Sequence, residues 1–144
     1  MGSVIRTILV PVDGSAGSGK AVALGSEFAR ACKASLTLLY VLPAESMVTI
    51  GAQALTDEQF EEAKDRMARR AFEPVSAATA EGARVVTETA IGNPSQEIIE
   101  HARRNRVDLI VIGSRGLSEF QQLLLGSVSS QVVHHAPCSV VVAR

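Results

Sequence analysis

Three glycines and a run of small hydroxyl residues mark the stretch of this chain best suited to chemistry. Gly113 follows the apolar run 107–112, Gly116 comes three residues later, and Gly126 opens the segment Ser127–Ser129. A strand that ends in such a loop brings its backbone close to a ligand. The first N–H groups of the helix that follows have no partner within that helix and carry the positive end of its dipole. The pattern favours a phosphate-binding cradle, and the alternative is a connection with ordinary turn glycines.

A second glycine-rich stretch, Gly14–Lys20, matches only part of the P-loop motif that binds nucleoside triphosphates. Ala21 stands where that motif needs a Ser or Thr hydroxyl for magnesium. Asp13 adds a negative charge beside a loop that would have to hold a triphosphate. No later predicted strand ends in an aspartate that would hold the same ion. We therefore expect no P-loop in this chain.

The composition indicates one domain spanning residues 1–144 with a formal net charge of -1. A chain of this length buries a sufficient core without a metal or disulfide. The balanced charge and few aromatic residues exclude a nucleic-acid footprint. Cys32 and Cys138 match no metal-ligand spacing, and no apolar run is long enough to cross a membrane. We expect a cytoplasmic protein that binds neither nucleic acid nor membrane.

Apolar runs alternate with helix signals along the whole chain. Strands are predicted at residues 5–12, 35–41, 84–90, 107–112 and 139–143. Helices are predicted to begin near residue 15 or 18, at the capping box 56–59, at 94 and at 126. Pro74 should kink or split the second of these helices, which Gly82 is expected to end. Residues 43–55 have no clean period and are expected to form a long connection, and the polar strand 84–90 should lie near a sheet edge.

This alternation predicts an α/β fold with a parallel sheet, right-handed crossovers and helices on both faces. In such sheets a ligand lies beyond the carboxyl ends of the strands, where the winding direction reverses. The loops Asp13–Ser18 and Gly113–Gly116 follow the first and fourth predicted strands. We therefore expect Asp13 to lie beside the glycine cradle.

The spacing Gly113-x-x-Gly116, nine residues, then Gly126-Ser127 resembles the nucleotide-binding signature of the universal stress protein family. The segment Ile8–Ser15 resembles the first strand and turn of that family. The segments Leu123–Val128 and His135–Val140 resemble its closing part. The resemblance extends over essentially the whole chain.

The resemblance implies a doubly wound, Rossmann-like domain that binds ATP, with five parallel strands in the order 3-2-1-4-5. It implies that the adenosine is lined by Pro11, Val12, Asp13 and Val41, with Asp13 bonded to the ribose or base. The ribose and phosphates would face Ile112, Gly113, Ser114, Arg115 and Gly116. The phosphates would be held by backbone N–H groups and hydroxyls of Gly126, Ser127, Val128 and Ser129, with magnesium or manganese bound through them. The family also implies a homodimer formed through the strand 139–143.

Several of these residues have a second interpretation. Asp13 alternatively caps the helix that follows it, and Arg115 is alternatively a solvated surface charge. His134 and His135 end a predicted helix, where a cation suits the dipole, so they do not indicate a metal site. For the function, slow ATP hydrolysis or phosphate transfer is an alternative to regulatory binding, although no base is clearly placed at the phosphate end. An interaction module with an empty cleft is the third hypothesis.

Overall fold

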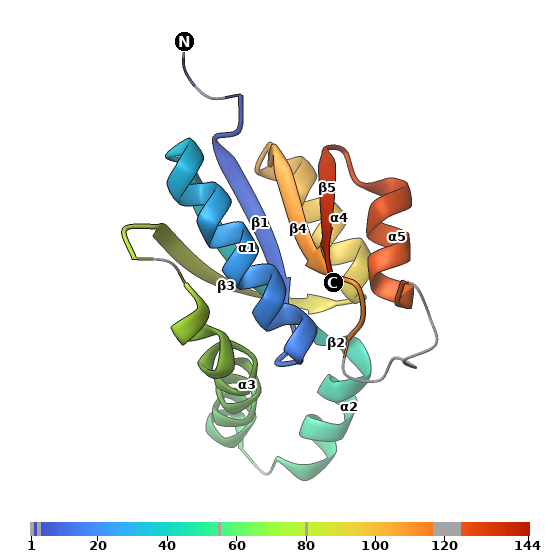
Figure 1. The fold of residues 1–144 in the computed structure, drawn as a ribbon. Coiled ribbons are helices and arrows are strands. Elements are labelled where there is room, and N and C mark those ends of the chain that lie inside the picture. Colours follow the sequence, from blue (N-terminus) through green and yellow to red (C-terminus); the bar gives the residue numbers. More distant parts are fainter. Residues whose placement is uncertain (1, 3, 55, 80, 117–124) are drawn as a thin grey trace.

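A five-stranded, all-parallel sheet forms the centre of the molecule (Figure 1). The computed structural model describes residues 2, 4–54, 56–79, 81–116 and 125–144. The strands are β1 (Thr7–Val12), β2 (Ser35–Pro43), β3 (Arg84–Gly92), β4 (Leu109–Gly113) and β5 (Ser139–Ala143). Their order is β3-β2-β1-β4-β5, so the predicted strand order is confirmed, and β3 lies at a sheet edge as its polarity predicts.

Helices cover both faces of the sheet, which confirms the doubly wound arrangement. They are α1 (Ala16–Cys32), α2 (Ala44–Gln53), α3 (Asp57–Phe72), the 3₁₀ helix η1 (Glu73–Ala78), α4 (Pro94–Arg104) and α5 (Ser127–His135). Because side chains alternate along a strand, Ile8 and Val10 pack on the face of α1, whereas Leu9 packs on the face of α4 and α5. Each fully buried Leu or Ile contributes about 1.5–3 kcal/mol of transfer free energy.

Local signals set the helix starts where the sequence predicts them. The Ser15 side chain caps α1 by accepting a hydrogen bond from the Ser18 N–H. Thr56 and Gln59 form the complete capping box of α3. Asn93 caps α4, and the helix begins with a proline. Proline suits the first helical position because an N–H there would have no partner within the helix, and proline has none.

Residues 43–55 are not a long connection, because most of them form α2. In this helix Ile50 is the buried residue and Met47 packs against the core, while Val48 is 75% exposed. Because an exposed valine stands beside these few buried residues, the apolar residues of this segment show no clear helical period in the sequence. The prediction at Pro74 is confirmed, since α3 ends at Phe72 and the chain continues as η1.

Pro11 lies where the pairing of β1 with β4 has ended. The register of β1 with β2 continues to Val12, whereas its register with β4 ends at Leu9. Asp108 N–H donates to the Thr7 carbonyl, so alternate residues from Thr7 onward turn their backbone groups toward β4. Pro11 is one of these residues and has no N–H to donate. The pairing of the two strands stops before their carboxyl ends, where the winding of the sheet reverses, and Pro11 can supply no bond to extend it.

Candidate functional site

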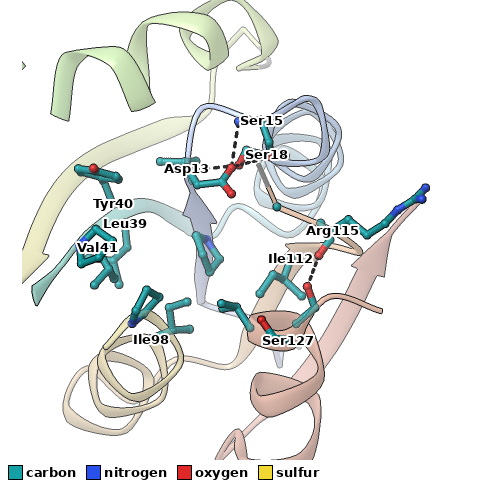
Figure 2. A pocket seen from close by; sticks show the side chains of 18 residues that line it. Asp13, Ser15, Ser18, Leu39, Tyr40, Val41, Ile98, Ile112, Arg115 and Ser127 are labelled. Atoms are coloured by element: carbon teal, nitrogen blue, oxygen red, sulfur yellow. Dashed lines mark hydrogen bonds between the residues drawn. The ribbon is translucent and has the colours of Figure 1, made fainter. Parts of the chain in front are cut away.

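A cleft of about 300 Å³ lies where β1 and β4 separate (Figure 2). The predicted site residues that line it are Pro11, Val12, Asp13, Val41, Ile112, Gly113, Arg115, Gly116, Ser127, Val128 and Ser129. Ser114 and Gly126 do not line it. Ser15 and Ser18, from the predicted loop Asp13–Ser18, also line it. The lining residues that sequence reasoning missed are Leu39, Tyr40, Pro43, Pro94 and Ile98. The predicted residues from distant parts of the chain therefore meet at one place.

Asp13 uses its two carboxylate oxygens differently. Its Oδ1 accepts hydrogen bonds from the Ser15 N–H, at 2.9 Å, and from the Ser18 hydroxyl, at 2.6 Å. The Asp13 N–H in turn donates to the Ser18 hydroxyl at 2.9 Å. The helix cap is Ser15, so the alternative in which Asp13 itself caps α1 is wrong. These bonds fix the carboxylate in one orientation.

The second oxygen of Asp13 faces the loop after β4. A Cβ placed on Gly116 would lie 2.7 Å from Asp13 Oδ2, so a side chain at Gly116 would displace the carboxylate. No residue in the described parts of the chain donates a hydrogen bond to Oδ2. This oxygen is an acceptor aimed at the cleft, and a ligand hydroxyl would satisfy it.

Backbone and hydroxyl bonds tie the start of α5 to the end of β4. The Ser114 N–H donates to the Ala143 carbonyl at 3.0 Å, and the Gly126 N–H donates to the Ser114 carbonyl at 2.6 Å. The buried Ser129 hydroxyl donates to the Gly113 carbonyl at 2.6 Å. Ser114 and Gly126 therefore hold β4, β5 and the start of α5 together. The Ser129 hydroxyl already donates its hydrogen bond to the same part of the structure.

The first turn of α5 faces the cleft without a side-chain cap. Its cap residue is Gly126, and the first hydrogen bond of the helix runs from the Ser130 N–H to the Gly126 carbonyl. The N–H groups of Val128 and Ser129 precede that bond, and no described residue pairs with them. Helix N–H groups in this position attract an anion.

Arg115 does not aim its charge into the cleft. Figure 2 shows its side chain extending away from the other lining residues. Arg115 is nevertheless one of the residues that line the cleft. Among the described lining residues, the carboxylate of Asp13 is then the charged group that faces the cleft.

The opposite side of the cleft is apolar and comes from β2 and α4. Leu39 and Val41 contribute from β2, and Pro94 and Ile98 from the first turns of α4. These residues belong to the carboxyl half of β2 and the start of α4, which adjoin the switch point of the sheet. Val41 is implied by the family resemblance, and Leu39 lies two residues before it, on the same face of β2. The contribution of α4 could not be predicted, because it depends on how that helix crosses the sheet.

Tyr40 borders the cleft and is held in a neutral form. Its ring packs edge-on against Phe72, with ring centroids 6.3 Å apart. Burial, and to a smaller extent the charge of Asp13, raise the pKa of the Tyr40 phenol above its ordinary value of 10.0. Tyr40 is the one tyrosine of the chain, which has no tryptophan. Its absorbance and fluorescence therefore report on this cleft.

Other chemistry receives no support in the described parts of the chain. There is no cluster of three potential metal ligands among those residues. The His134 ring donates from Nδ1 to the Ser130 carbonyl at 2.8 Å. Both cysteines are free, and burial is the main cause that raises the pKa of the Cys138 thiol, which makes it less reactive. Across the described residues, no helix is long and apolar enough to cross a membrane.

Comparison with known proteins places this chain in one family. A family model described as the universal stress protein family matches residues 5–144. Universal stress protein YxiE of Bacillus subtilis is 33% identical over 149 residues, which cover 98% of this chain and 100% of that relative.

Solved structures agree with this result. Universal stress protein UspA from Lactobacillus plantarum superposes with a TM-score of 0.77 and 32% identity, covering 99% of both chains. A universal stress protein solved in complex with cAMP has a TM-score of 0.70 and 25% identity, covering 99% of this chain and 98% of its own. On its sequence and its fold, the chain belongs to the universal stress protein family.

Proposed function

We propose that this protein binds ATP in the cleft between β1 and β4 and acts as a cytoplasmic, nucleotide-dependent regulator in a stress response. One observation carries the proposal: a single cleft has an apolar side, together with a carboxylate oxygen and a helix start that no described residue pairs or caps. These features match a base, a ribose and a phosphate chain in that order. The relative solved with cAMP supports an adenine nucleotide as the ligand class.

The proposal assigns each part of the nucleotide to one region. The adenine packs against Val41 and its apolar neighbours on β2 and α4. A ribose hydroxyl donates to Asp13 Oδ2, and a hydrogen bond to a charged group of this kind contributes about 1.5–3 kcal/mol. The phosphates accept hydrogen bonds from the N–H groups of Val128 and Ser129, with the loop from Gly113 to Gly116 beside them. A magnesium or manganese ion, held through the phosphates, supplies positive charge.

The same geometry favours binding over turnover. Hydrolysis needs a group that orients the attacking water and cations that meet the charge of the transition state. Asp13 is the carboxylate among the described lining residues, and its Oδ1 already accepts two hydrogen bonds within its own turn. We therefore expect ATP to stay largely intact in the presence of the protein. Brisk turnover that an Asp13→Ala variant abolishes would contradict this.

A charge placed at the start of α5 tests the phosphate assignment. Val128 lines the cleft, so Val128→Glu puts a carboxylate against the same N–H groups and repels the phosphates. An acidic residue suits a helix start, but Val128 also packs against the core, so circular dichroism must show that the variant is folded. The control is Gln131→Glu, which adds the same charge to an exposed position of α5.

Calorimetry with ATP and magnesium should give an affinity weaker by about tenfold or more for Val128→Glu, and an unchanged one for Gln131→Glu. Equal affinities for both variants would show that the phosphates do not bind at the start of this helix. A Gly113→Val variant would be uninformative, because a Cβ on Gly113 would lie 2.8 Å from the backbone of Gly17.

We also propose a homodimer formed through β5. This strand lies at the sheet edge opposite β3, and Val140, Val141 and Val142 are each only half-buried. An apolar edge strand with open backbone groups favours pairing with a second copy across a two-fold axis.

A further inference from the structure

The stretch Gly14–Lys20, which fails as a P-loop, contains a glycine that touches the other side of the nucleotide cleft. Gly17 lies in the first turn of α1. A Cβ placed on it would lie 2.6 Å from the Arg115 carbonyl oxygen. A Cβ placed on Gly113 would lie 2.8 Å from both the carbonyl carbon and the carbonyl oxygen of Gly17. The two segments therefore pack backbone against backbone, and neither position has room for a side chain.

We propose that Gly17 is a positioning residue for the phosphate side of the cleft. The inference rests on the proposed nucleotide function and names a residue that sets the geometry of that site. Gly17 is not itself part of the cleft lining, whereas Gly113, Arg115 and Gly116 are. Its effect on a ligand is therefore exerted through the loop that it contacts.

The loop is held firmly on its other side. The Ser129 hydroxyl holds the Gly113 carbonyl, and the N–H of the following Ser114 holds the end of β5. Gly17 contacts the same backbone from the side of α1. A methyl group at position 17 would push the Arg115 carbonyl away from α1, against these ties and toward the phosphate side.

A second close contact joins the same two segments. Gly116 lies one residue beyond Arg115, and its α-carbon approaches Asp13 Oδ2 so closely that a Cβ would lie 2.7 Å from that oxygen. The turn that carries Asp13 leads directly into α1 and its Gly17. Two close contacts therefore set the distance between Asp13 and the loop after β4. They are the contact of Gly17 with Arg115 and that of Gly116 with Asp13.

The helix itself gives no reason for glycine at this position. Glycine has a lower helix propensity than alanine, and Gly17 is not at a left-handed backbone angle. Gly19 stands two residues later in the same helix, and a Cβ placed on it would meet nothing within 4 Å. The two positions thus differ in one respect, which is the contact of Gly17 with the loop after β4.

Gly17→Ala and Gly19→Ala therefore form a matched pair, because each adds one methyl group to the same turn. We expect Gly19→Ala to bind magnesium ATP like the unmodified protein in calorimetry. Gly17→Ala should bind it about tenfold more weakly, while its affinity for adenosine changes by less than about twofold. A purely structural effect would weaken adenosine and ATP alike. Thermal unfolding without ligand, followed by circular dichroism, shows that both variants are folded.

Equal ATP affinities for the two variants would overturn the inference, as would an equal loss of adenosine and ATP affinity. A Gly17→Ala variant that does not fold would also contradict it, because the contact would then serve the fold and not the site. An unmodified protein that binds no ATP would instead overturn the proposed function itself. The two failures are distinguishable because the unmodified protein is measured in the same experiment.

Discussion

At the scale of single residues, the site is defined by what each group is already bonded to. Asp13 and Ser129 both belong to the predicted site, yet they differ in their bonds. One oxygen of Asp13 accepts no hydrogen bond from the described residues, whereas the Ser129 hydroxyl already donates to the Gly113 carbonyl. Residue type alone predicts a hydroxyl donor at Ser129. Only the three-dimensional structure distinguishes a group that is already bonded within the protein from one that a ligand can bond to.

The pKa of Tyr40 gives a prediction at this scale. Burial and the charge of Asp13 both raise it, so the folded state favours the neutral phenol. The stability linked to Tyr40 is complete below pH 10, the ordinary pKa, and is lost as the pH rises through the higher pKa of the folded protein. The absorbance of the phenolate should therefore titrate above pH 10.0 in the folded protein and near that value in urea.

Two variants test the causes of this shift. Asp13→Asn should lower the pKa of Tyr40 only partly, because burial is the larger cause. Tyr40→Phe should lose less stability than the unmodified protein between neutral and strongly alkaline pH. A folded-state titration at the ordinary pKa would contradict the buried setting of the phenol.

At the scale of helices and strands, an element can be predicted from the sequence when the residues that specify it are neighbours in the chain. The capping box at Thr56 and the Asn93-Pro94 start of α4 are local, and both are confirmed. The sequence does not reveal α2, because this helix packs against α3 and β2, whose positions the sequence does not give. The split at Pro74 is predictable from the sequence, since the missing N–H is a property of the residue itself.

The bond between α5 and β4 gives a prediction at this scale. Ser129→Ala removes the donor to the Gly113 carbonyl and leaves that buried acceptor unpaired. The free energy of unfolding should fall by about 1–3 kcal/mol, measured by urea denaturation. Ser130→Ala is the control on the same helix, and its effect should stay within about 0.5 kcal/mol. Similar losses for both variants would contradict a specific tie at Ser129.

At the scale of the whole molecule, the strand order creates the site. The alternation of strands and helices, with the family resemblance, sufficed to predict the order that brings Asp13 beside Gly116. The outward direction of Arg115 and the part of Ile98 in the cleft could not be predicted. Both depend on how side chains and helices are oriented around the sheet and not on any spacing in the chain. The resemblance segment Leu123–Val128 is tested only in part, because its first two residues lie outside the described residues.

The proposed dimer gives a prediction at this scale. Since the Ala143 carbonyl accepts from Ser114, alternate residues of β5 face β4, and the backbone groups of Val140 and Val142 face the open edge. Val140→Pro removes one outward N–H and spares the bonds to β4. Sedimentation should give a dimer for the unmodified protein and for Val140→Thr, and a monomer for Val140→Pro. A dimer that survives Val140→Pro would place the interface elsewhere.

The central claim is that this cleft holds ATP, and the fluorescence of Tyr40 tests it most directly. Tyr40 lines the cleft and is the chain's one tyrosine, and there is no tryptophan to obscure its emission. Titration with magnesium ATP, corrected by a parallel titration of free tyrosine for nucleotide absorbance, should change the emission until one site is saturated. The Val128→Glu variant should need a higher ATP concentration for the same change. An emission that stays constant, while the protein remains folded, would contradict nucleotide binding at this place.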